Sequence, residues 1–168
     1  MNFFSNWKRK KMIKKSSSFI IDELAEIVIE TVDHFEKEGN IKNPTQKEGL
    51  KLESTIFVFW LFQKSNVFPN QLHKLINDEI HDQYFEKLRK HGYEYEKRKR
   101  ISEEFNARYK TYNELFPPDG DPIIIALSFA QSLAEKSKVD LDKSHALIPY
   151  YLIEKTTPKF QEWRKVTF

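Results

Sequence analysis

The sequence contains no cysteine and only four glycines among its 168 residues. Without cysteine the chain cannot form a disulfide, a zinc–thiolate site, an iron–sulfur cluster or a thiol nucleophile. The glycines are too few and too scattered for a P-loop or a dinucleotide-binding turn, and no G-x-S-x-G motif is present. No histidine is followed by glutamate, so the H-E-x-x-H zinc helix is also absent. The common sequence signatures of an enzyme are therefore missing, and we expect no catalytic, cofactor or metal site.

Long hydrophobic runs are lacking as well. The longest wholly apolar run, Ile56 to Phe62, is far shorter than the roughly 20 residues that cross a bilayer. The basic stretch from Lys8 to Lys15 is followed by only three apolar residues before Asp22, which does not resemble a signal peptide. We therefore expect a cytoplasmic location, with peripheral membrane attachment as an alternative.

Apolar residues recur at helical spacing along most of the chain, and no convincing alternating strand is present. The sequence predicts an all-α, single-domain bundle of about six helices. A flexible basic tail is expected over residues 1–18, and the bundle over 19–168. The helices are expected at about 19–37, 45–64, 70–90, 93–115, 121–136 and from about 140, the last interrupted at Pro149 and followed by a short helix near Pro158.

The segment 45–64 is predicted to be the central, very apolar helix of the bundle, because its middle part reads IFVFWLF. Thr45 is the expected N-cap, with Glu48 three residues later completing a capping box. A buried strand is the alternative interpretation of the apolar run, but polar, helix-forming flanks favour the helix.

The net charge of +3 is unevenly distributed along the chain. The first 15 residues hold six cations and no acid, whereas the remainder holds 22 cations against 25 acids, a net charge of about −3. Aromatic residues precede the cations, a composition suited to an anionic membrane surface or to phosphate groups of nucleic acid. On a helix only the first two turns would be amphipathic, so a solvated tail is the other interpretation. The candidate contact residues are Phe3, Phe4, Trp7, Lys8, Arg9, Lys10, Lys11, Lys14 and Lys15.

Several charged or polar residues project onto the apolar faces of the expected helices. They are Glu30, His34, Glu53, Glu79 and Arg108. A buried charge needs a partner, and pairing of Arg108 with Glu53 or Glu79 is the simplest solution. We therefore predict a buried polar network, with charged side chains that reach solvent at the helix edges as the alternative.

The same polar residues leave a metal site or Glu–His acid–base chemistry open as alternatives. Glu30 and His34 are spaced i,i+4, and carboxylates from other helices could complete a ligand set. The paired Glu-x-x-His motifs typical of di-iron bundles are missing, and nothing in the sequence identifies a substrate pocket.

The sequence resembles no family that we can identify from its motifs. We predict a non-enzymatic helical protein that acts through contacts with a protein partner or through self-association. Peripheral attachment to an anionic membrane through the basic, aromatic N-terminus is the first alternative. A nucleic-acid-binding accessory protein and a metal-binding bundle enzyme are the second and third.

Overall fold

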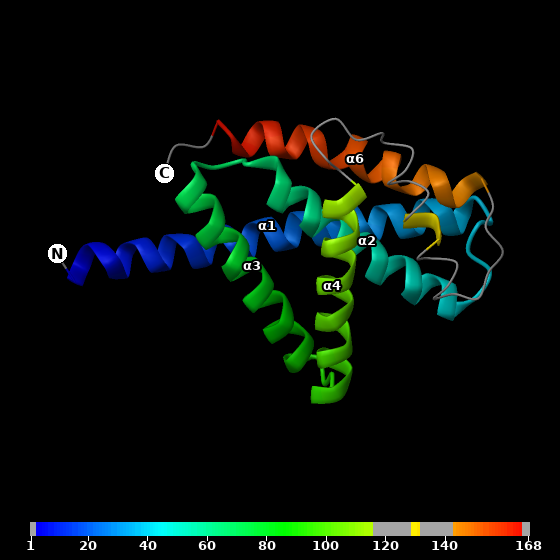
Figure 1. The fold of residues 1–168 in the computed structure, drawn as a ribbon, viewed down its shortest axis with the longest axis horizontal. Coiled ribbons are helices and arrows are strands. Elements are labelled where there is room, and N and C mark those ends of the chain that lie inside the picture. The colour runs from blue at the N-terminus through cyan, green and yellow to red at the C-terminus, as the bar shows by residue number, and fades with distance from the viewer. Residues whose placement is uncertain (1–2, 116–128, 132–142, 166–168) are drawn as a thin grey trace.

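The computed structural model describes residues 3–115, 129–131 and 143–165, without the side chains of residues 3–6 and 143–145. The described helices are α1 (Phe3–Lys37), α2 (Pro44–Ser65), α3 (Asn70–Lys90), α4 (Tyr95–Leu115) and α6 (Lys143–Trp163), and residues 129–131 are helical too. These ranges contain no strand, and the predicted all-α bundle is confirmed. Figure 1 shows α1, α2 and α6 running alongside one another, with α3 and α4 projecting from them as a helical hairpin.

Helix α1 is the longest element and extends well beyond the predicted range of 19–37. Its 35 residues run without a break through Ser16–Ser18, three residues of weak helix propensity. Ser17 is completely buried and donates a hydrogen bond to the carbonyl oxygen of Ile76 in α3. Packing against α3 thus outweighs the weak helix propensity of serine. Residues 3–18 are accordingly helical and continuous with the rest of α1.

The N-cap of α2 is not the residue that the sequence predicted. Asn43, rather than Thr45, is the N-cap, and its side-chain oxygen accepts a hydrogen bond from the backbone N–H of Gln46 at 3.0 Å. Pro44 follows at the first helical position, where its missing N–H costs no hydrogen bond. The helix ends at Asn66, which adopts the left-handed conformation that asparagine tolerates well.

Helix α2 contacts α1, α3, α4 and α6. Its residues 56–60 are all buried, so packing surrounds this part of the helix on every side. The buried set also includes Gln46, Glu53 and Ser54, and Lys51 and Lys64 are exposed. The helix therefore mixes an apolar segment with buried polar groups.

An aromatic cluster joins the α3–α4 hairpin to α2. The ring of Phe59 from α2 lies 5.3 Å from Tyr84 and 5.8 Å from Phe105, both in edge-on geometry. Tyr84 and Phe85 of α3 in turn contact Phe105 of α4. Edge-on pairs of this kind stabilise beyond their buried area, so the cluster fixes the hairpin on the bundle.

Helix α6 passes through two prolines at which a break was expected. Pro149 and Pro158 both lie inside the helix, so the predicted interruption and the separate short helix were wrong. Each proline removes one backbone hydrogen bond. The helix is held instead by packing on α1 and α2, with Ile148, Leu152, Phe160 and Trp163 buried. The predicted turn at 117–122, and all but residues 129–131 of the predicted helix over 121–136, lie outside the described residues.

None of the helices in the described ranges is both long enough and apolar enough to cross a membrane.

Candidate binding groove

An open groove of about 630 Å³ lies beside the turn that joins α3 to α4. Helices α1 and α2 form one side, and the end of α3 and the start of α4 form the other. Most of the lining side chains are apolar or aromatic. They are Ile21, Leu24, Ala25, Val28, Ile29, Leu52, Phe59, Tyr84, Leu88, Tyr93 and Ile101. The volume is within the roughly 300–1,000 Å³ of sites that bind ligands in proteins.

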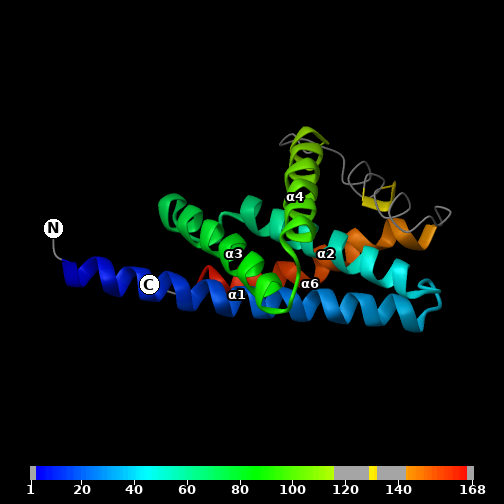
Figure 2. The same ribbon diagram turned by 90° about the horizontal axis from the view of Figure 1, so that it is seen from below.

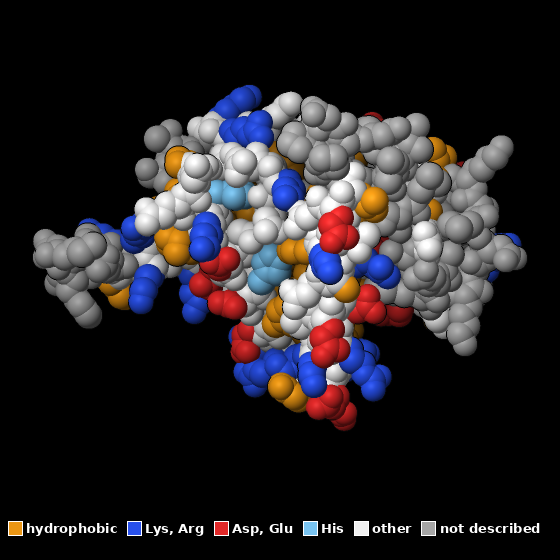
Figure 3. Space-filling model, viewed as in Figure 1, with side chains coloured by type: hydrophobic (Ala, Val, Ile, Leu, Met, Phe, Trp, Pro, Cys, Tyr) orange, Lys and Arg blue, Asp and Glu red, His pale blue; other side chains and the backbone are white. Residues whose placement is uncertain are grey.

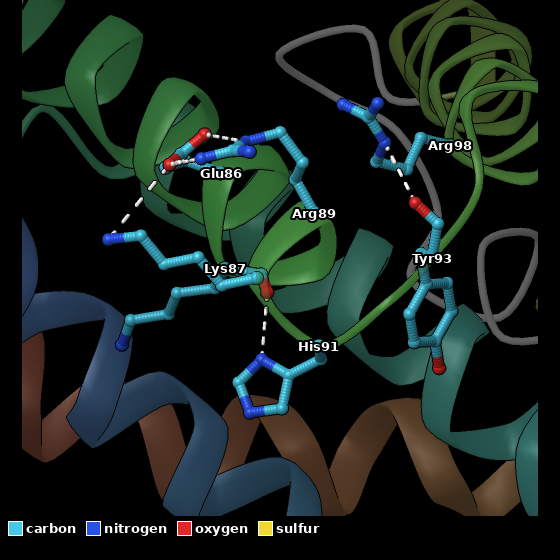
Figure 4. Close-up of polar contacts among 7 residues, drawn as sticks. Glu86, Lys87, Arg89, His91, Tyr93 and Arg98 are labelled. Carbon is cyan, nitrogen blue, oxygen red and sulfur yellow. Dashed lines mark hydrogen bonds and ion pairs between the residues drawn. The ribbon is translucent and has the colours of Figure 1, made fainter.

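The turn between α3 and α4 positions the outer wall of the groove. Gly92 adopts a φ of +80°, which lets the chain reverse directly after α3. The ring nitrogen Nδ1 of His91 lies 2.7 Å from the carbonyl oxygen of Lys87, and Arg98 donates a hydrogen bond to the carbonyl oxygen of Tyr93. Figure 4 shows that the side chains of Lys87, His91 and Tyr93 project from this turn toward α1 and α2.

The rim of the groove carries more positive than negative side chains. Lys51, Lys87 and Lys97 line it, whereas Glu48 is the single acid among the lining residues. Lys87 pairs with Asp22 of α1 at 2.6 Å, and the Lys97 ammonium lies 4.3 Å from the centre of the Tyr93 ring. The groove therefore combines an apolar floor with a cationic edge.

The side of the groove formed by α1 contains a second row of apolar residues. Ala25 and Ile29 are spaced i,i+4 on α1, beside the main stripe of buried residues, and Ile29 stays 52% exposed. Neither residue was predicted from the sequence to belong to a site. The signal in the sequence is the spacing of Ala25 and Ile29, which makes the apolar face of α1 broader than one neighbouring helix can cover.

A second polar feature lies inside the bundle, between α2 and α4. Glu53 is completely buried, and its Oε2 lies 3.4 Å from Nε of Arg108, whose side chain is 17% exposed. The hydroxyl of Tyr112 donates a hydrogen bond to Oε1 of Glu53 at 2.5 Å. Burial, and then the adjacent carboxylate, hold the pKa of Tyr112 well above 10, so that the phenol remains a donor.

The other residues of the predicted network do not join this pair. Glu30 and His34 are exposed on α1, because only part of that side of the helix is covered by α6. Glu30 lies 3.8 Å from the ammonium of Lys155, and the His34 ring stacks on Tyr151. Glu79 is half-buried and accepts a hydrogen bond from Gln83 on its own helix. The structure brings together Glu53 and Arg108 and leaves the other three apart from them.

The candidate metal ligands do not gather either. Within the described residues, no three His, Asp or Glu side chains lie close enough together to hold a metal ion. The buried Glu53 faces an arginine and a tyrosine, which fits a structural ion pair better than a ligand set.

The basic residues near the N-terminus lie on α1, whose first turns project beyond the other described helices in Figures 1 and 2. Trp7 and all six cations are exposed, and the Lys11 ammonium lies 5.3 Å from the centre of the Trp7 ring. The side chains of Phe3 and Phe4 lie outside the described residues. Lysine and arginine side chains gather on the projecting end in the space-filling view (Figure 3).

One buried histidine, His73, and one half-buried histidine, His81, predict how stability depends on pH. Burial lowers the pKa of His81, which lies between Asn77 and Tyr109, and also that of His73. A histidine whose pKa is lower in the folded state binds its proton more readily when the chain unfolds. We therefore expect stability to be constant above the ordinary histidine pKa of about 6.5 and to fall below it.

Urea denaturation at about pH 7.5 and about pH 5 measures this effect. The free energy of unfolding should be lower at the acid pH, and His81→Gln should reduce the difference between the two conditions. Equal pH dependence in the wild type and the variant would contradict the assignment to His81.

Comparison with known proteins leaves the groove and the charged helix end as the basis for a functional argument. The chain matches no protein-family model, no curated protein and no solved structure. We therefore base the functional proposals on these two surfaces.

Proposed function

We propose that the protein is a non-enzymatic binding module that holds an amphipathic helix of a partner protein in the groove between α1, α2 and the α3–α4 hairpin. The observation that carries the proposal is the open, apolar groove of about 630 Å³ with Ile29 half-exposed at its edge. An apolar side chain at the rim gains by burial only if the bound molecule extends over the rim, as a helix lying in a groove does.

The charge of the rim favours a particular kind of helix. Lys51, Lys87 and Lys97 surround the apolar floor, so acidic residues beside the apolar stripe of the partner would meet cations. Such rim contacts contribute mainly to selectivity and to the rate of association. The proposed partner segment therefore has apolar residues at i, i+3, i+4 and i+7, with glutamate or aspartate on both sides of the stripe.

Two further expectations accompany this proposal. Self-association would satisfy it if a second copy supplied the helix, and the solution mass would show this. The cytoplasmic location, with peripheral membrane attachment as the alternative, stays a prediction.

A peptide panel tests the groove directly. Three helical peptides of about four turns share one leucine stripe and carry glutamate, glutamine or lysine beside it. We expect the glutamate peptide to bind tightest and the lysine peptide weakest, with about a tenfold difference in Kd, because each exposed charge pair contributes about 0.2–1 kcal/mol. Fluorescence anisotropy with labelled peptides measures the three constants.

A matched pair of tryptophan variants identifies the surface that binds. Ala25→Trp places a large ring in the groove, whereas Ala107→Trp adds the same ring to an exposed position of α4 outside it. Ala25→Trp should weaken binding of the glutamate peptide at least tenfold, and Ala107→Trp should leave it unchanged. Equal affinities for the two variants, or no binding of any peptide to the wild type, would refute the proposal.

A further inference from the structure

We propose that the exposed face of α1 between Trp7 and Phe19 binds the surface of an anionic phospholipid membrane. This surface, which we call the cationic face, is separate from the groove. Five residues define it, namely Trp7, Lys8, Lys11, Lys15 and Phe19. On an α-helix they fall within about 120° of arc, opposite the buried Ile13 and Ser17.

The N-terminal part of α1 carries a concentrated positive charge. Six cations follow one another between Lys8 and Lys15, over about 10 Å of helix. Within the ranges that the structure describes, none of the six forms an ion pair. The positive charge is therefore available to an external anion, and it is complementary to a leaflet that contains acidic lipid. The acids Asp22, Glu23 and Glu26 follow on the same helix and confine the contact to its N-terminal part.

Two large aromatic rings of the cationic face are exposed. Trp7 is 56% exposed and Phe19 is 54% exposed, although both are large apolar side chains. Aromatic rings flanked by lysines partition favourably into the interfacial region of a bilayer, while the lysine ammonium groups reach the headgroups. Exposure of both rings on the same face as the lysines is thus accounted for by a surface that is both anionic and partly apolar.

The bundle holds the cationic face in place. Ser17 and the carbonyl oxygen of Lys14 are hydrogen-bonded to Ile76 and Gln83 of α3, so the helix is anchored below the face. The end of α1 also projects beyond the other described helices (Figures 1 and 2), and no described element stands in front of it. A projecting convex helix suits a broad surface, whereas single-stranded nucleic acid is bound in a positively charged groove with stacking rings.

Vesicle co-sedimentation of the full chain tests the proposal. We expect binding to vesicles of phosphatidylcholine with phosphatidylserine and none to phosphatidylcholine alone. The variant K8E/K11E/K15E should lower the partition coefficient at least about 100-fold, since it removes and reverses three of the charges that attract acidic lipid. Trp7→Ala should lower it several-fold while leaving the net charge unchanged.

The matched control is K99E/R100E/K110E, which makes the same change in net charge at exposed positions of α4. It should bind the anionic vesicles within about twofold of the wild type. Equal loss of binding in the two triple variants would show that net charge alone is responsible, and would overturn the proposal. It would also be overturned if single- or double-stranded DNA oligonucleotides bound through the same lysines while the anionic vesicles did not bind.

Discussion

Replacement of Arg108 by methionine is expected to lower the free energy of unfolding by about 3 kcal/mol. Glu53 has no exposed surface, and Arg108 is the cation whose Nε lies 3.4 Å from its carboxylate. Removing one partner of a buried ion pair leaves the other charge in a poorly solvated place without that compensation. The hydrogen bond from Tyr112 remains in the variant, so we expect a loss near the lower end of the range for buried pairs.

A double variant separates two costs, that of burying the Glu53 charge without Arg108 and that of losing side-chain packing. E53M/R108M replaces both charges with apolar side chains of similar length, and such replacements are often nearly neutral. We therefore expect the double variant to be more stable than R108M, although it carries one more substitution. Arg100→Met, at an exposed position on the same helix, is the control and should change stability by less than about 0.5 kcal/mol.

Urea denaturation followed by circular dichroism measures all three variants. A loss below about 1 kcal/mol in R108M would show that solvent compensates Glu53 once Arg108 is gone. The single variant E53M, measured in the same way, completes the cycle. A double variant that loses the sum of the losses in R108M and E53M would show that Glu53 and Arg108 are not coupled.

The sequence predicted a carboxylate partner for Arg108 from two local facts, but it left Glu53 and Glu79 as alternatives. Each residue projects onto the apolar face of its own helix, and a buried charge requires a partner of opposite sign. Glu30 and His34 satisfied the first condition on α1 but are exposed. A helical projection gives the direction of a side chain, but it does not show how far the neighbouring helix extends over it.

Two of the differences from the predicted helix boundaries share one physical cause. At Ser16–Ser18 and at Pro149 and Pro158, local propensity favours a break, and yet the helix continues. In both places the stabilising contacts come from distant parts of the chain, as in the hydrogen bond from Ser17 to Ile76. Such contacts have no signal in the local sequence, whereas the cap at Asn43 and Pro44 did have one and was passed over in favour of Thr45.

The groove could not be predicted, because it depends on how the hairpin stands on the bundle. Its walls come from four helices, and the sequence shows only that α1 has a broad apolar face and that a glycine follows α3. The cationic face, in contrast, is contiguous in sequence. Its composition was visible at once, and the structure adds that it lies on a helix anchored to α3.

The contacts that hold the α3–α4 hairpin on α2 should contribute strongly to stability. Replacement of Phe59 by alanine is expected to lower the free energy of unfolding by about 4 kcal/mol, within the range for buried phenylalanine residues. Phe59 is 3% exposed, and its ring contacts His81 and Tyr84 of α3 as well as Phe105 of α4. The alanine variant loses the buried area and all of these edge-on contacts, and it leaves a cavity between α2 and the hairpin.

The loss should also be unevenly distributed over the molecule. Because Phe59 contacts both α3 and α4, amide hydrogen exchange should accelerate more in these two helices than in α1 and α6. Phe19→Ala makes the same chemical change at a side chain that is 54% exposed, and it should cost less than about 1 kcal/mol. Uniform acceleration of exchange in all helices would show that the hairpin unfolds only together with the rest of the bundle. A small loss in Phe59→Ala would show instead that the hairpin can repack on α2, in which case the groove beside its turn would not have a fixed shape.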